Sequence, residues 1–240
     1  MKTLFFSKIT MIGVLTCFAS LASAGIMIGG TRVIYTEPSK EASIMVINQS
    51  AQDIMIQSWI DPEDKQDSQN VPFIVTPPLS RLGGNKQQVL RILYSGETLP
   101  ADRESVFRLN VQEIPQKSKD NNSLQIAVRQ RIKLFYRPIG IEGKPDDAPK
   151  MLQWRLVEKL GKPAVEVWNP SSFNVSFSGA MLHSGSSKFP IPIGMIAPKS
   201  KQIISIQGLV SSKHDKAGSI EFTAINDYGG HDSYSSKLSH

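Results

Sequence analysis

The sequence predicts an all-β protein made of two β-sandwich domains. Short apolar runs, many of them alternating with polar residues, recur along the chain and are separated by turns rich in glycine and proline. No stretch shows the 3.6-residue period of an amphipathic helix. With 240 residues, the chain can form one large β domain or two domains of about a hundred residues each.

The expected strands of the first domain follow one another closely. Each combines an apolar run with a turn signal, and in chain order they cover residues 29–35, 43–48, 54–60, 73–75, 88–94, 105–114 and 123–138. The strand at 73–75 ends at Thr76-Pro77-Pro78, because proline cannot donate to a sheet ladder. The sequence does not decide whether these X-Pro bonds are cis or trans. About seven short strands are typical of one immunoglobulin-like sandwich.

A linker and a second set of strands follow. Residues 139–149 are rich in glycine, proline and charge, which is typical of a linker. The expected strands of the second domain cover residues 152–156, 164–168, 174–182, 202–206 and 219–225. We interpret His231-Asp232-Ser233 as part of a tail. The prediction is therefore an immunoglobulin-like domain over residues 25–143 and another over 144–240, with a binding cleft between them.

Residues 123–138 form the longest alternating run and have two interpretations. Leu124, Ile126 and Val128 share one parity, and cations gather on the other. A long central strand with one face in the core and the other in water would give this pattern. An edge strand whose first half stays unpaired until another chain supplies a groove would also give it. Such an exposed apolar edge is normally blunted, so Leu124, Ile126 and Val128 would then be exposed for use.

The first 24 residues have the features of a secretory signal. Lys2 and Lys8 precede an apolar stretch at residues 9–19, and residues 22–24 (ASA) fit an A-x-A cleavage site. The apolar stretch is too short for a membrane span, and no other segment approaches the ~20 residues required. We expect an exported chain that begins near Gly25 after cleavage and is not an integral membrane protein.

Charge and reactive side chains give no sign of an enzyme. The net charge of +6 falls to +4 without the two lysines of the signal, and the basic residues are dispersed with no nucleic-acid-binding motif. The only cysteine, Cys17, lies in the signal, so the mature chain has no disulfide. The four histidines do not stand at metal-ligand spacings. We therefore predict no catalytic residues, no metal, no cofactor and no nucleic-acid partner.

The stretch Ile132–Pro138 (IKLFYRP), preceded by LQIAV, resembles the signature of the periplasmic pilus chaperones, the PapD/FimC-like family of the chaperone–usher pathway. Residues 224–230 (AINDYGG) are similar to the same family, and the resemblance covers essentially the whole mature chain. It implies two immunoglobulin-like sandwiches arranged as an L or boomerang, with an interdomain cleft, in the periplasm. Many members have a disulfide in the second domain, which this chain lacks.

The resemblance also implies an anchor for a partner. Arg32 and Lys133 resemble the two cleft cations of the family, which bind the C-terminal carboxylate of a pilus subunit. A carboxylate can accept hydrogen bonds from a guanidinium and from an ammonium, and burial strengthens those bonds. Leu124, Ile126 and Val128 correspond to the side chains that fill a groove on the subunit.

Three further charges are similar to an interdomain salt-bridge network of the family, namely Glu104, Arg137 and Asp227. In the family this network sets the angle between the two sandwiches. The same charges could otherwise be unconnected surface residues, each of little energetic weight.

The function implied is donor-strand complementation, a form of β-augmentation. The chaperone would lend its long strand to a pilus or fimbrial subunit whose own sandwich lacks a strand, and would deliver it to an outer-membrane usher without ATP. The free chaperone could also cap its strand by forming a dimer. The alternative is a structural subunit or adhesin of a surface fibre, which should lack the IKLFYRP strand and the paired cations and would usually have a disulfide.

Overall fold

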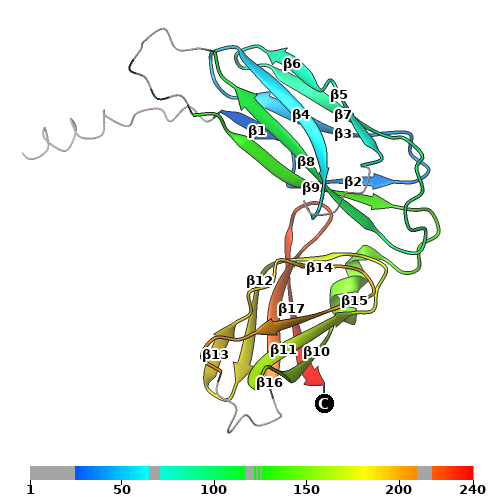
Figure 1. The fold of residues 1–240 in the computed structure, drawn as a ribbon, viewed down its shortest axis with the longest axis vertical. Coiled ribbons are helices and arrows are strands. Elements are labelled where there is room, and N and C mark those ends of the chain that lie inside the picture. Colours follow the sequence, from blue (N-terminus) through cyan, green and yellow to red (C-terminus); the bar gives the residue numbers. More distant parts are fainter. Residues whose placement is uncertain are drawn as a thin grey trace, which may run out of the picture.

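The computed structural model describes residues 25–64, 71–116, 122, 124, 126–209 and 218–239. The predicted signal, residues 1–24, lies outside the described residues. The all-β prediction is confirmed: the strands form two separate sandwich-like bodies (Figure 1). Within the described part of the chain, no helix is long and apolar enough to cross a membrane.

The first domain consists of two packed sheets. Its strands are β1 (Ile26–Ile28), β2 (Arg32–Thr36), β3 (Ala42–Asn48), β4 (Ile54–Pro62), β5 (Phe73–Thr76), β6 (Leu79–Leu82), β7 (Gln87–Tyr94), β8 (Ser105–Ile114) and β9 (Arg129–Arg137). One sheet has the order β1-β3-β7-β5, and the other has the order β2-β9-β8-β4-β6. Apolar side chains from both sheets, such as Val46, Leu90, Leu109 and Leu134, are fully buried between them.

The beginning of this domain is divided differently from the prediction. The expected strand at 29–35 is β2, which begins only at Arg32, and β1 before it was not predicted. The two belong to different sheets: β1 pairs with β3, whereas β2 runs parallel to β9. The intervening Gly29-Gly30 lets the chain cross from one sheet to the other, because glycine tolerates such a change of direction. Thr76-Pro77 is a cis peptide bond.

The long strand is shorter than predicted. β9 begins at Arg129, not at residue 123, and Leu124 and Ile126–Val128 are outside any strand. Arg129 pairs with Gln112, and the Glu113 amide donates the next ladder bond to the Val128 carbonyl (2.9 Å), which is the last such bond among the described residues of this edge. Continuing that register places Pro115 opposite Ile126. Pairing stops there because proline has no N–H to donate.

The second domain is one continuous path of strands around its own core. Its strands are β10 (Gln153–Lys159), β11 (Lys162–Asn169), β12 (Val175–Ser184), β13 (Ser187–Pro190), β14 (Met195–Ile196), β15 (Ser200–Ser205), β16 (Gly218–Ile225) and β17 (His231–Ser239). The order is β13-β12-β16-β17-β10-β11-β15, with β14 paired to β12. Trp154, Leu182, Ile196 and Ile220 lie fully buried at its centre.

The interpretation of residues 231–233 as a tail was wrong. They begin β17, which pairs with β16 from His231 to Lys237 and then with β10 at Leu238 and Ser239. The stretch has few apolar residues, but Leu238 is buried and Tyr234 stacks on Phe222. Pairing with a central strand outweighs the weak strand propensity of this serine-rich segment. β13 and β14 were not predicted either.

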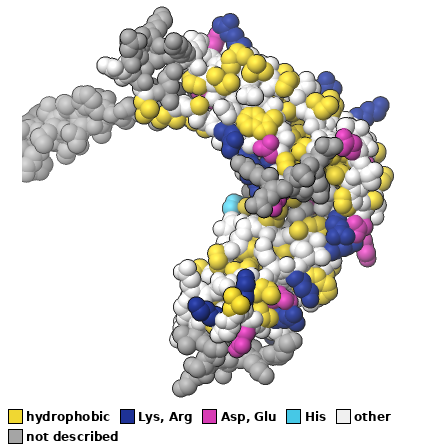
Figure 2. Space-filling view, viewed as in Figure 1, with side chains coloured by type: hydrophobic (Ala, Val, Ile, Leu, Met, Phe, Trp, Pro, Cys, Tyr) yellow, Lys and Arg dark blue, Asp and Glu magenta, His cyan; other side chains and the backbone are white. Residues whose placement is uncertain are grey.

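Between the domains, the chain forms the short helices η2 (Pro145–Asp147) and α2 (Ala148–Met151). The two bodies lie at an angle, so that the molecule is bent (Figure 1). A space-filling view shows a hollow at the bend, with lysine and arginine side chains on the wall that the first domain contributes (Figure 2). The domain boundary between residues 143 and 144 stays a prediction.

Candidate functional site

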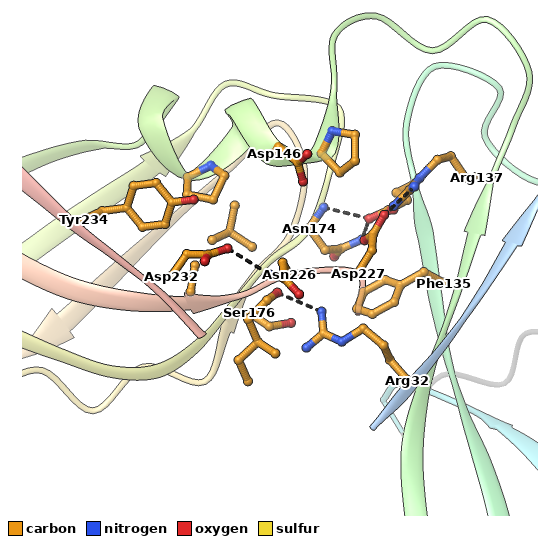
Figure 3. Close-up of a pocket in the computed structure, with 16 residues that line it drawn as sticks. Arg32, Phe135, Arg137, Asp146, Asn174, Ser176, Asn226, Asp227, Asp232 and Tyr234 are labelled. Carbon is orange, nitrogen blue, oxygen red and sulfur yellow. Dashed lines mark hydrogen bonds and ion pairs between the residues drawn. The ribbon is translucent and has the colours of Figure 1, made fainter. Parts of the chain in front are cut away.

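Arg32 and Lys133 lie side by side at the hollow. They are direct partners in the parallel register of β2 and β9, so their side chains leave the sheet on the same face. Both reach the second domain: Arg32 Nη1 donates to the Ile225 carbonyl (2.9 Å), and Lys133 Nζ donates to Ser176 Oγ (2.8 Å). Figure 3 shows Arg32 extending from the first domain toward the second, where Ser176 lies in β12 and Ile225 in β16. The structure thus brings the two predicted anchor residues together.

The Arg32 guanidinium is partly removed from water. It lies over the Phe135 ring, 5.5 Å from the ring centroid, and its Nε is buried without a hydrogen-bond partner among the described residues. Burial lowers the pKa of Arg32, and the negative charges of Asp227 and Glu104 oppose that effect. The cation therefore still has hydrogen-bonding capacity for an incoming acceptor.

Lys133 is likewise a cation that is partly removed from water. The pKa of Lys133 is lowered to about 8, mainly by burial and also by the neighbouring charges of Arg108 and Arg32, while Glu63 partly opposes them. Glu63 is itself paired with Arg108, whose Nη2 lies 2.6 Å from Glu63 Oε1. No carboxylate of the described residues pairs with Lys133. A bound carboxylate would supply that missing negative charge.

A small cavity lies beside Arg32, between the domains. Its volume is about 30 Å³, and its lining includes Arg32, Phe135, Asn174, Ser176 and Asp227 but not Lys133. This is room for roughly two water molecules. A carboxylate that contacts both cations must therefore approach from the open hollow and compete with Ser176 for the Lys133 ammonium.

Glu104, Arg137 and Asp227 also meet. Arg137 donates to Glu104 Oε1 through Nε (3.0 Å) and Nη2 (2.6 Å), and to Asp227 through Nη1 (2.9 Å) and Nη2 (3.2 Å). The Glu104 side chain is 2 % exposed and that of Arg137 is 15 % exposed. Burial opposes the Arg137 charge, but its bonds to Asp227 and Glu104 prevail and raise its pKa. Because Asp227 belongs to the second domain, the cluster joins the domains.

Sequence reasoning missed several residues of this junction. Asn174 donates its backbone N–H (2.9 Å) and its side-chain amide (3.0 Å) to Glu104 Oε2, and Phe173 lies under the Arg137 guanidinium. Gly229 approaches Thr31 so closely that a Cβ on it would stand 2.6 Å from Thr31 Oγ1. These contacts join distant parts of the chain, so no local sequence pattern predicts them.

The three predicted groove-filling side chains are exposed. Leu124 is 88 % exposed, Ile126 is 71 % exposed and Val128 is 41 % exposed. They share their parity with Leu134 and Tyr136, which are buried in the core of the first domain. The core-facing side of β9 thus continues past the end of its own domain. Of the two interpretations of this stretch, the structure agrees with the unpaired, exposed edge.

We predict that Lys133→Met stabilises the free protein at neutral pH. The folded-state pKa of about 8 is below the ordinary 10.5, so the charged lysine opposes folding below pH 8. That penalty is relieved as the pH rises from about 8 to 10.5. After allowance for partial exposure, we expect a gain of about 1–2 kcal/mol at pH 7 that is lost by pH 10.5, measured by urea unfolding. A gain of equal size at both pH values would contradict this origin.

We predict that Arg137→Ala destabilises the protein by about 3 kcal/mol or more, because the buried Glu104 carboxylate loses its counter-charge. Thermal melting measures the loss, and small-angle X-ray scattering measures the change in interdomain angle. The control is Arg103→Ala. It removes an arginine that is paired with the neighbouring Asp102 in the loop before β8, and it should change the melting temperature little. Equal melting temperatures for the two variants would show that the buried cluster has no structural weight.

Comparison with known proteins identifies the family of both domains. Residues 25–142 match the family described as pili and flagellar-assembly chaperone, PapD N-terminal domain, and residues 147–236 match the PapD C-terminal domain. The chain is 41 % identical over 228 residues to the probable fimbrial chaperone YadV of Escherichia coli K12, covering 90 % of this chain and 91 % of that protein. It is 40 % identical over 211 residues to the chaperone protein LpfB of Salmonella typhimurium, covering 86 % of each.

Solved structures agree. The crystal structure of the YadV chaperone superposes with a TM-score of 0.78 at 39 % identity, covering 90 % of this chain and all of that one. The SafB chaperone of Salmonella enterica, solved in complex with the SafA pilin, gives a TM-score of 0.74 at 28 % identity, covering 89 % of this chain and 96 % of that one. Both domains, their order and the bent arrangement are thus shared. The chain belongs to the PapD family of fimbrial assembly chaperones.

Proposed function

We propose that this protein is a periplasmic chaperone that completes the sandwich of a pilus or fimbrial subunit with the segment Leu124–Val128. The observation that carries the proposal is the continuation of the core-facing side of β9 into solvent. Leu124, Ile126 and Val128 stand where core residues would stand, but no part of their own domain covers them. A subunit that lacks one strand has the complementary defect, a core open along a groove.

Arg32 and Lys133 act as the anchor for the C-terminal carboxylate of the subunit. Two adjacent, partly buried cations without a carboxylate of their own suit one carboxylate group. Lys133 is five residues from Val128 and nine from Leu124 along the chain. At roughly 3.3 Å per residue, the anchor fixes the subunit about 16–30 Å from the three side chains. Because a shift of one residue would reverse the faces, this anchor determines the register.

The driving force is the unfinished core of the subunit, so neither ATP nor a cofactor is needed. Burying three aliphatic side chains of this size contributes roughly 1.5–3 kcal/mol each before the cost of ordering the segment. The subunit is then passed to an outer-membrane usher, which replaces the chaperone. In the free protein a second copy could cover the same side chains, which gives a self-capping dimer.

The alternative of a structural subunit or adhesin has less support. Each sandwich of this chain encloses its own hydrophobic core, and neither core includes Leu124, Ile126 or Val128. A subunit should also lack the IKLFYRP strand and the paired cations, both of which this chain has.

We predict that Lys133→Ala and Arg32→Ala each abolish recovery of a subunit with the chaperone from the periplasm. The reason is that one carboxylate partner is lost in a desolvated site, which typically costs ~2–5 kcal/mol. Co-purification with an affinity-tagged subunit measures the effect. Lys201→Ala, a change at an exposed lysine over Trp168 in the second domain, is the control and should retain full binding. Normal subunit yield from the Lys133 and Arg32 variants would remove the anchor.

We predict that Ile126→Asp prevents subunit binding and leaves the free chaperone folded. The position is exposed in the free protein, but in the complex the charge would enter an apolar groove without a counter-ion. Ala127→Asp, one residue away on the opposite parity, is the matched control and should bind much better. Melting curves and subunit pull-down with both variants make the comparison. An Ile126→Asp variant that is unfolded by itself would refute the exposed segment and favour a buried central strand.

A further inference from the structure

The start of the described chain is fixed at the place where the two sheets of the first domain meet. The carbonyl of Gly25 accepts a hydrogen bond from the Gln49 amide (3.2 Å). The carbonyl of the next residue, Ile26, accepts one from the Gln130 side chain of β9 (2.6 Å). From Ile26 onward the chain is paired with β3. The position of Gly25 is therefore determined by both sheets.

The Glu113 carboxylate lies directly against Gly25. A Cβ built on Gly25 would stand 2.2 Å from Glu113 Oε2 and 3.2 Å from Glu113 Cδ, so only glycine fits here without a shift. Given the length of a backbone N–Cα bond, Oε2 lies within about 5 Å of the Gly25 nitrogen. Glu113 also shares the core-facing parity of β8 with the buried Leu109 and Val111.

This carboxylate lacks a partner. Glu113 Oε2 is buried and has no hydrogen-bond partner among the described residues. An unsatisfied buried oxygen, more so a charged one, is costly and calls for an explanation. A cation that arrives at the Gly25 nitrogen would provide one.

We propose that removal of the signal creates this cation, so that the new N-terminus of Gly25 forms an ion pair with Glu113. The inference rests on the export that the proposed function requires, and on cleavage after Ala24, which the A-x-A pattern at residues 22–24 predicts. Hydrolysis of the Ala24–Gly25 bond adds hydroxyl to the Ala24 carbonyl carbon and hydrogen to the Gly25 nitrogen. The freed amine then takes up a proton, since α-amino groups ordinarily have a pKa of about 7.7–8.0. The neutral amide of the precursor cannot make this pair.

The ion pair also reaches the subunit-binding segment. The backbone N–H of Glu113 donates to the carbonyl of Val128 (2.9 Å), where the exposed segment joins the sheet. The proposed ion pair and the base of that segment therefore meet at the same residue of β8, Glu113. Only the processed chaperone has the ion pair between Gly25 and Glu113. Removal of the signal is thereby coupled to the ordering of the site where a subunit would bind.

The test combines two N-termini with two side chains. Mature protein that begins at Gly25, verified by intact mass, is compared with protein that begins at Ala24, each with Glu113 or with Glu113→Gln. In the Gly25 protein, Glu113→Gln should lower the melting temperature by about 2–4 °C and speed hydrogen exchange at the amide of residue 113 several-fold. In the Ala24 protein, where the amine is displaced by one residue, the same change should have little effect. Glu97→Gln, at an exposed carboxylate of the same domain, should have little effect in both.

An equal loss of stability from both N-termini, or from neither, would overturn the ion pair. A periplasmic chain that begins at another residue would overturn its link to maturation. Subunit co-purification is measured separately with the Gly25 protein. The proposed chaperone function thus stands or fails independently of the ion pair.

Discussion

The structure depends most on the alternation of side chains along β9. One parity of this strand contributes Leu134 and Tyr136 to the core of the first domain, and the other contributes Lys133 and Arg137 to the junction with the second. Because the period of a strand is two, the same backbone builds a core, a pair of interdomain contacts and an exposed apolar segment. A shift of one residue would exchange all of these faces at once.

Charged side chains make several directional contacts across the junction. Arg137 brings two carboxylates together, and Arg32 and Lys133 bond to a carbonyl and a hydroxyl of the opposite domain. Buried ion pairs of this kind contribute little net stability, but their directional bonds favour one arrangement. These directional bonds therefore define the angle between the domains, and with it the access to Lys133. Burial beside Arg108 and Arg32 lowers the pKa of Lys133, and a bound anion, as we propose, would offset that cost.

Much of the fold could be predicted from local patterns, and the remainder was decided by distant contacts. Alternation and turn residues located most strands, and the resemblance identified the five charged residues that the structure brings to the junction. The break before Arg129 depends on Pro115, which directly follows the neighbouring strand β8, and β17 forms because β16 provides an edge with which it can pair. Asn174 and Ser176 enter the site only because the second domain folds against the first. Glu113 carried a signal that was overlooked, a charge on the core-facing parity of β8.

The central claim is that the backbone of the exposed segment becomes a strand of the partner. Hydrogen exchange at the successive amides of residues 124–128, compared between the free chaperone and its complex with a subunit, tests this most directly. The account predicts fast exchange in the free protein and protection by about a hundredfold or more at alternate amides in the complex, because every second N–H enters a ladder bond with the subunit. Binding that leaves these amides as exposed as in the free protein would contradict it.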